Sequence, residues 1–128
     1  MADSPMQVQL VAPDRMVWSG EAEIVLARTL DGELGILANH APLLGVLAEA
    51  PVTIRPVDGD AIVAAVHGGF LSVGGNEVQV LAETVELKDE IDVARARRSR
   101  DEHESGEDDA DKAAVRRANA RLRAAGEE

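Results

Sequence analysis

The chain has 128 residues, a formal net charge of −11 at pH 7 and only two aromatic side chains, Trp18 and Phe70. This length allows one modest domain with a small appendage, and the 45% hydrophobic content is enough for one core of aliphatic residues. The absence of cysteine excludes disulfides, thiolate zinc sites and a cysteine nucleophile. The negative charge and the scarcity of rings on which bases stack argue against nucleic-acid binding.

Residues 1–88 predict a β domain. Met6–Leu10 alternates apolar and polar residues, the period of a half-buried strand, and Ala61–Val66 is continuously apolar, which favours a strand covered on both faces. Weaker alternation marks further strands at residues 21–26, 52–55 and 78–80. Because turn residues separate these short runs and no long helical pattern interrupts them, a sandwich or barrel is predicted. Pro51 and Pro56 restrict the strand between them to an edge or to a short length.

Residues 89–128 predict two helices, at about 89–103 and about 109–125. This segment contains nine basic and twelve acidic residues, so the change in composition near residue 88 indicates a domain boundary. The candidate N-caps are Asp89 or Asp92 for the first helix and Asp108 or Asp109 for the second. The apolar faces are thin, and they consist of Ile91, Ala94 and Ala96, then Ala110, Ala114, Ala118 and Leu122. Such a hairpin buries little, so we expect it to depend on docking and to be able to move.

The segment Asp31–Leu47 interrupts aliphatic runs with Asn-His-Ala-Pro at residues 39–42. A metal site at His40 needs further ligands, and the spacing of the other two histidines does not supply them. No nucleophile arrangement surrounds this histidine either. Two interpretations remain. One is a rigid turn, since Pro42 lacks an N–H and restricts the residue before it. The other is a contact surface that includes the protruding leucines Leu43 and Leu44.

A glycine pair follows His67, at Gly68 and Gly69. A phosphate-binding loop would need a helix directly after the glycines. The next residues, Phe70–Val73, instead predict a strand, so we expect the glycines to allow a bulge or a close approach of two backbones.

Arginines on the two predicted helices form a candidate anion site. Arg117 and Arg121 lie four residues apart on one helix face and could converge on an anion with Arg95 of the neighbouring helix. From the residues alone, a solvated helix with many salt bridges is the favoured alternative, because acidic residues lie near each arginine. No paired-carboxylate or nucleophile constellation is present, so the sequence indicates an interaction protein rather than an enzyme.

Five motifs along the chain carry a resemblance to a known family. They are Gly32–Leu37, His40–Leu44, Gly68–Val73, Val78–Glu83 and Ile91–Ala96. In this order and spacing they resemble the epsilon subunit of the F-type ATP synthase, and the resemblance runs from about Val8 to Leu122.

The resemblance implies a ten-stranded β-sandwich at residues 1–88 followed by an antiparallel two-helix hairpin at residues 89–128. It implies a non-catalytic central-stalk subunit whose sandwich binds the gamma subunit and the c ring. The hairpin would extend to the alpha/beta head and inhibit ATP hydrolysis. The location implied is the cytoplasmic face of the bacterial plasma membrane, reached only through the complex, since no apolar run approaches the roughly 18 residues that span a bilayer.

By resemblance, the interface with gamma and the c ring includes Asp31, Glu33, His40 and Leu43. The turn at Asp31 and the bend at His40 are expected to hold these side chains outward. The segment is expected to be anchored in the sandwich by Leu34, Ile36 and Leu37. One departure from the family is that Ala38-Asn39 stands where Pro-Gly is usual.

By the same resemblance, Ile91–Ala96 is a regulatory nucleotide signature in which ATP binds between the helices and favours the compact form. No cofactor or metal is required, and ATP would be regulatory. The matching residues are Glu86, Asp92, Arg95, Arg117 and Arg121. Glu102 stands where the family has a further arginine, which counts against ATP binding. Two helices of roughly 15 residues would reach only about 40 to 45 Å end to end, which weakens the expected inhibition.

Overall fold

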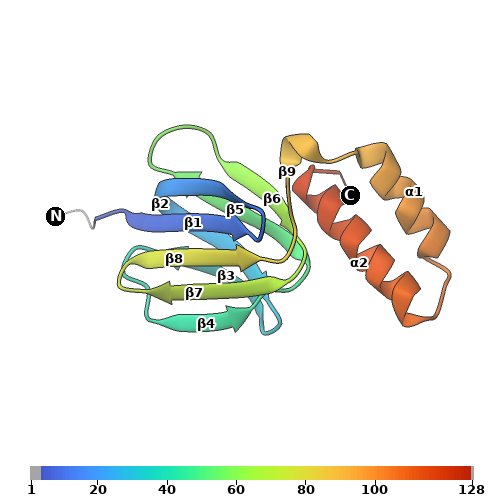
Figure 1. Ribbon diagram of the computed structural model, residues 1–128, viewed down its shortest axis with the longest axis horizontal. Helices are drawn as coiled ribbons and strands as arrows, with labels where there is room; N and C mark the ends of the chain where they lie inside the picture. Colours follow the sequence, from blue (N-terminus) through green and yellow to red (C-terminus); the bar gives the residue numbers. More distant parts are fainter. Residues whose placement is uncertain (1–3, 128) are drawn as a thin grey trace.

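The computed structural model in Figure 1 describes residues 4–127. Within them, nine strands are followed by a 3-10 turn, η1 (Lys88–Glu90), and two helices, α1 (Val93–His103) and α2 (Asp109–Ala124). The strands are β1 (Met6–Ala12), β2 (Arg15–Thr29), β3 (Gly32–Leu37), β4 (Leu43–Val46), β5 (Ala50–Pro56), β6 (Ile62–Val66), β7 (Gly69–Gly74), β8 (Glu77–Ala82) and β9 (Val85–Leu87). The predicted class, a β-sandwich followed by a helical hairpin, is confirmed.

The strand β2 explains why the count is nine and not the expected ten. Its first half, up to Ala22, pairs with β1, and its second half pairs with β5 from Ala22 and with β3 from Ile24. The hydrogen-bonded order is β4-β7-β8-β1-β2-β5-β6-β9, with β3 also on β2. One strand of 15 residues therefore passes from one layer of the sandwich into the other. The expectation of ten strands was wrong because this single strand serves both layers.

The core lies between the two layers. The alternation predicted for the first strand is confirmed, because Met6, Val8 and Leu10 are at most 1% exposed. The opposite layer contributes Ile36 and Ile54, which are fully buried. The core is therefore aliphatic, as the composition indicates.

Of the two outcomes predicted from its prolines, an edge position or a short length, the edge position is wrong for β5. It pairs with β2 on one side and with β6 on the other. Pro51 lies beyond the ladder with β2, which covers residues 53–56, and Pro56 lies beyond the ladder with β6, which ends at Ile54. Each proline is therefore paired with only one neighbouring strand, so an interior strand tolerates both prolines.

Gly69 marks a close approach of two backbones, as the glycine pair predicts. Its φ is +124°, and a Cβ at this position would lie 2.1 Å from the carbonyl oxygen of Leu81 on β8. We expect Gly69→Ala to lower the free energy of unfolding by about 3 kcal/mol or more, because the backbone must shift. Urea unfolding followed by circular dichroism measures this. Gly74→Ala is the control, since nothing lies within 4 Å of its Cβ position, and an equal loss there would contradict the explanation.

The helices begin at aspartate caps. The Asp92 side chain accepts a hydrogen bond from the Arg95 N–H at 3.0 Å, and the Asp108 side chain accepts one from the Asp111 N–H at 2.8 Å. Both caps are among the predicted candidates. The first helix begins at Val93 and not at residue 89, because residues 88–90 form η1 instead.

The hairpin is docked at one end of the sandwich (Figure 1), where α2 packs on β5 and β6 and α1 packs on α2. The predicted face of α2 is largely confirmed, because Ala114, Ala118 and Leu122 are buried, although Ala110 is exposed. In α1 only Ala96 is buried, and Ala94 is exposed, contrary to prediction. The first helix is therefore attached through the second.

Candidate functional site

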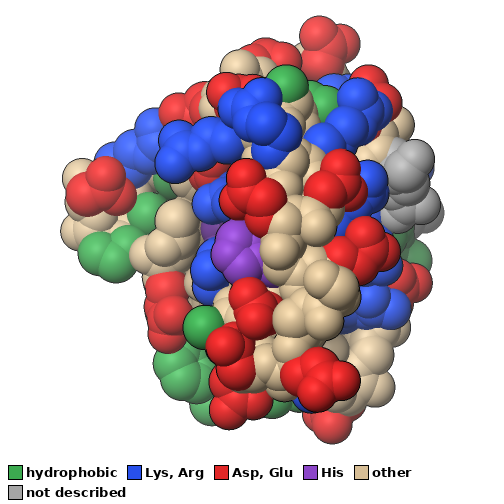
Figure 2. Space-filling model, turned by 90° about the vertical axis from the view of Figure 1, so that its right-hand side faces the viewer, with side chains coloured by type: hydrophobic (Ala, Val, Ile, Leu, Met, Phe, Trp, Pro, Cys, Tyr) green, Lys and Arg blue, Asp and Glu red, His purple; other side chains and the backbone are tan. Residues whose placement is uncertain are grey.

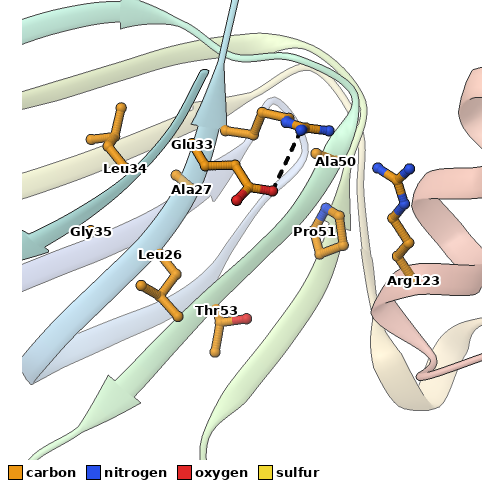
Figure 3. Close-up of a pocket in the computed structure, with 10 residues that line it drawn as sticks. Leu26, Ala27, Glu33, Leu34, Gly35, Ala50, Pro51, Thr53 and Arg123 are labelled. Carbon is orange, nitrogen blue, oxygen red and sulfur yellow. Dashed lines mark ion pairs between the residues drawn. The ribbon is translucent and has the colours of Figure 1, made fainter. Parts of the chain in front are cut away.

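The β2–β3 turn carries two of the predicted interface residues. Thr29 Oγ1 accepts a hydrogen bond from the Asp31 N–H at 3.2 Å and donates to the Gly32 carbonyl at 3.3 Å. Asp31 is exposed, and the Glu33 side chain is 77% exposed and lies 3.5 Å from the Arg28 guanidinium. Glu33 lines a groove of about 450 Å³ between the sheet and Arg123 of α2, as Figure 3 shows. The turn thus holds both carboxylates toward solvent.

The bend at His40 is a tight turn built around Asn39. The His40 N–H donates to the Leu37 carbonyl at 3.1 Å, and Asn39 has a φ of +64°. Asparagine adopts this left-handed conformation more readily than most residues other than glycine, so Ala38-Asn39 is compatible with a turn where the family usually has Pro-Gly. The Asn39 N–H also donates to the side chain of Asn76 at 2.8 Å. This hydrogen bond could not be predicted from the sequence, because Asn76 lies in a different turn.

Two leucines lie differently from what the sequence predicts. Leu37 does not anchor the segment, since it is 59% exposed, whereas Ile36 is fully buried and Leu34 packs against the core. Leu43 does not protrude, because it also packs against the core, and the protruding side chain is Leu44, at 74% exposed. Strand pleating decides which side chain of each neighbouring pair faces outward.

A row of apolar side chains crosses the outer face of one layer, over β4, β7, β8, β1 and β2. The members of this apolar row are Val46, Phe70, Leu81, Val11 and Met16, each directly opposite the next on the neighbouring strand. Phe70 is the aromatic side chain of the row, and it is 52% exposed. These side chains are therefore available for contact.

The adjacent row on the same face is uncharged and, apart from Leu44, polar. Its members are Leu44, Ser72, Gln79, Gln9 and Ser19. Two neighbouring rows without a charge are notable in a chain with 29% charged residues. A partner can cover such a face without burying an unpaired charge. Sequence reasoning missed it because the rows depend on the register of five strands.

The two helices and the end of the sandwich enclose a polar cavity of about 310 Å³. Its lining includes all five residues of the predicted nucleotide site, which are Glu86, Asp92, Arg95, Arg117 and Arg121. The structure also adds Glu90 and Ser99 to this lining, whereas Glu102 is not part of it. The helix spacing had brought Arg95, Arg117 and Arg121 together, the family resemblance had added Glu86 and Asp92, and all five converge in space.

The arginines of this cavity are not equivalent. The Arg121 Nε donates to Glu86 Oε1. Within residues 4–127, the guanidinium groups of Arg95 and Arg117 make no hydrogen bond or ion pair. Two unpaired cations at one cavity favour an anionic ligand. Over the outer surface of the hairpin, in contrast, acidic and basic side chains are interspersed (Figure 2).

Glu90 connects this region to the sandwich. Its carboxylate accepts hydrogen bonds from Arg15 at 3.0 Å and from the Leu87 N–H at 2.9 Å. The Arg15 hydrogen bond and then the Leu87 hydrogen bond hold the pKa of Glu90 below its usual range. The same contact raises the pKa of Arg15. The start of the hairpin is therefore tied to β2.

Beneath α2 lies a buried histidine that sequence reasoning did not assign. His67 is 8% exposed, and its two ring nitrogens lie 3.1 Å from Glu49 and 3.0 Å from Glu86. These residues come from three neighbouring strand ends, so only the tertiary structure brings them together. Among the described residues, no group of acidic or histidine side chains has the arrangement of a metal site, and no helix is long and apolar enough to cross a bilayer.

Comparison with known proteins identifies the class. Residues 5–88 match the family model described as the beta-sandwich domain of the ATP synthase delta/epsilon chain. The fold and this match define a β-sandwich subunit of an ATP synthase. The chain is 55% identical over 119 residues to the ATP synthase epsilon chain of Streptomyces griseus, which covers 93% of this chain and 94% of that protein. It is 47% identical over 125 residues to the epsilon chain of Corynebacterium diphtheriae, with 97% and 94% covered. The chain belongs to the ATP synthase epsilon-chain family.

Solved structures share the fold. A chain of the Euglena gracilis mitochondrial ATP synthase, from a structure of OSCP, F1 and the c ring, superposes with a TM-score of 0.84 over 98% of this chain and 83% of that chain. A chain of the Tetrahymena thermophila central stalk and c ring gives 0.65, covering 98% and 97%. At 21% and 20% sequence identity, these likenesses show the fold alone.

Proposed function

We propose that this chain is a non-catalytic central-stalk subunit of a proton-translocating F-type ATP synthase, and that its apolar row binds the gamma subunit. The observation that carries the proposal is the uncharged face on β4, β7, β8, β1 and the start of β2, away from β5 and β6, on which the hairpin docks. An apolar contact of this kind is weakly screened by salt. Mixing with gamma should therefore yield a 1:1 complex on size-exclusion chromatography at low and high salt. Separate elution under every salt condition would refute the proposal.

The β2–β3 turn and the His40 bend are proposed to face the c ring. Glu33→Gln and His40→Ala should lower ATP-driven proton pumping several-fold, because they change exposed groups on a stiff support. The midpoint of thermal unfolding should change little, since neither side chain lies in the core. Pumping by reconstituted vesicles measures the first effect. Asp58→Asn, an exposed change in the loop between β5 and β6, should leave pumping unchanged, and equal loss in this control would contradict the assignment.

The hairpin is proposed to regulate ATP hydrolysis by leaving the sandwich and contacting the alpha/beta head. Support comes from its thin attachment, since α1 buries only Ala96. The helices have 11 and 16 residues, which correspond to about 40 Å when laid end to end. This reach is short, so the inhibition is proposed to be weak. The location proposed for the assembled chain is the cytoplasmic face of the bacterial plasma membrane, peripheral and within the complex.

A regulatory nucleotide is proposed for the cavity between the helices, with ATP favouring the docked form. The supporting observation is that the guanidinium groups of Arg95 and Arg117 line a polar cavity and have no partner in the described part of the chain. Ser99 supplies a hydroxyl to the same lining. The alternative function, a free-standing nucleotide sensor, would bind ATP at this cavity without the gamma subunit. Binding of gamma therefore distinguishes the stalk subunit from the sensor.

A further inference from the structure

The groove on the outer face of β3, β2 and β5 has an apolar half and a charged half. Leu26 of β2 lies directly opposite Gly35 of β3 and Thr53 of β5. Two residues farther along β2, on the same face of the strand, Arg28 lies opposite Glu33. All five residues line the groove of about 450 Å³ that Figure 3 shows. A row without charge is therefore followed directly by a row with two charges.

The apolar half is open because one of its positions is a glycine. Leu26 is 37% exposed, and a Cβ at Gly35 would lie 3.3 Å from Leu26 Cδ2. A larger residue at position 35 would therefore fill the space beside this leucine. Pro51 adds further apolar surface to the lining. The groove volume lies toward the lower end of the range of about 300 to 1,000 Å³ for small-molecule sites, which suits a ligand with a single apolar chain.

The charged half is more basic than the rest of the chain. Among residues 4–127, the charged side chains that line the groove and an adjoining hollow of about 440 Å³ are three arginines and two carboxylates. They are Arg28, Arg116, Arg123, Glu33 and Glu49. The whole chain has 13 basic and 24 acidic residues, so the balance is reversed here. This end of the groove therefore favours an anion over a cation.

The guanidinium of Arg28 is held only loosely by its carboxylate partner. It lies 3.5 Å from Glu33, whereas strong hydrogen bonds between charged groups measure roughly 2.7 to 2.9 Å. The two side chains are 41% and 77% exposed, and an ion pair this accessible to water contributes little to stability. A carboxylate held over the apolar half can therefore replace Glu33 at Arg28.

The backbone around the groove favours an acyl chain over a peptide. The strand β2 pairs with β3 on one side and β5 on the other, and β5 also pairs with β6. These two strands therefore offer no free ladder of hydrogen bonds to a third segment. A peptide needs partners for its own N–H and C=O groups, whereas an acyl chain needs none.

We propose that this groove binds a long-chain carboxylate, with its chain over Leu26 and Thr53 and its carboxylate on Arg28. Arg123 of α2 faces the same groove (Figure 3), so the ligand would contact the hairpin as well as the sandwich. Among the described residues, the groove shares no lining residue with the cavity between the helices. This site is therefore separate from the proposed nucleotide site, and it requires neither ATP nor the gamma subunit.

Titration of the full, isotope-labelled chain with decanoate, followed by backbone amide NMR, tests the proposal. We expect chemical-shift changes to be concentrated at the groove, including Gly35 and Thr53. Arg28→Gln should raise the Kd about tenfold, the effect of losing one hydrogen bond to a charged group. Glu33→Gln should lower the Kd several-fold, because it removes the competing carboxylate. Gly35→Val should abolish binding, because it fills the space beside Leu26.

The matched control variant is Arg55→Gln. Arg55 is an exposed arginine on the same face of β5 as Thr53, and it lies outside the groove lining. This change should alter the Kd by no more than about twofold. Circular dichroism establishes that each variant is folded, and if Gly35→Val is not, the opposite effects of Arg28→Gln and Glu33→Gln still test the site.

Two further probes separate the halves of the ligand. Decan-1-ol has the chain without the charge, and butanoate has the charge without the long chain, so both should bind at least about tenfold more weakly than decanoate. Equal binding of either probe, or an affinity that Arg28→Gln leaves unchanged, would overturn the proposal. Binding of the chain to phosphatidylglycerol vesicles without any binding of decanoate would overturn it as well, because the occupant would then be a membrane surface.

Discussion

Replacing Phe70 with glutamate should weaken the complex with the gamma subunit by about 100-fold or more, which corresponds to roughly 2.7 kcal/mol. Phe70 lies within the apolar row, between Val46 and Leu81. Aromatic side chains surrounded by other contacts dominate binding energy at interfaces, and a buried carboxylate without a partner adds a further cost. Titration calorimetry with purified gamma measures the loss.

The matched control for Phe70→Glu is Leu37→Glu. Leu37 is 59% exposed and Phe70 is 52% exposed, so both changes add one negative charge at an exposed strand position. Leu37 lies on β3, in the other layer of the sandwich. We expect Leu37→Glu to change the affinity by no more than about twofold, because it lies outside the proposed contact. Thermal unfolding should be similar for both variants. Equal weakening by the two substitutions would show that the apolar row is not the gamma contact.

The double substitution Arg95→Ala, Arg117→Ala should abolish the heat of ATP binding. Among residues 4–127, neither guanidinium has a partner at the cavity between the helices, and a hydrogen bond between charged groups contributes about 1.5 to 3 kcal/mol. Loss of two such contacts to phosphate should weaken binding by about 100-fold or more. Calorimetry at millimolar ATP measures it. Absence of heat with the unmodified chain would reject the nucleotide site and leave the stalk function unaffected.

The control for this pair is Arg98→Ala, Lys112→Ala. It removes the same two charges, one from each helix, at exposed positions outside the cavity lining. A general electrostatic attraction between ATP and the hairpin would be weakened equally by both double substitutions. A specific site predicts loss only in Arg95→Ala, Arg117→Ala. Binding that survives in that variant would contradict the proposed contacts.

The spacing of residues predicted those site features that lie on one element. On α2, Arg117 and Arg121 share a face, because positions four apart on a helix are neighbours, and both line the cavity. The cap at Asp92 was likewise identified from local chemistry. For neighbouring residues on a strand, in contrast, the sequence did not predict which side chain faces outward. Whether Leu43 or Leu44 protrudes depends on how the strand is seated on the core, and a shift of one residue exchanges the two faces.

By itself, the sequence determined a sandwich or barrel with a charged helical hairpin, the aliphatic core, the turn at Asp31 and the possible convergence of Arg95, Arg117 and Arg121. These follow from local periodicity, turn chemistry and helix spacing, which act over a few residues, whereas Glu86 and Asp92 were added to the cavity set by the family resemblance. Only the tertiary structure decided the passage of β2 through both layers, the apolar row and the contacts of His67 with Glu49 and Glu86. Each of these depends on the register between strands distant in sequence, and that register is established by packing of the whole core.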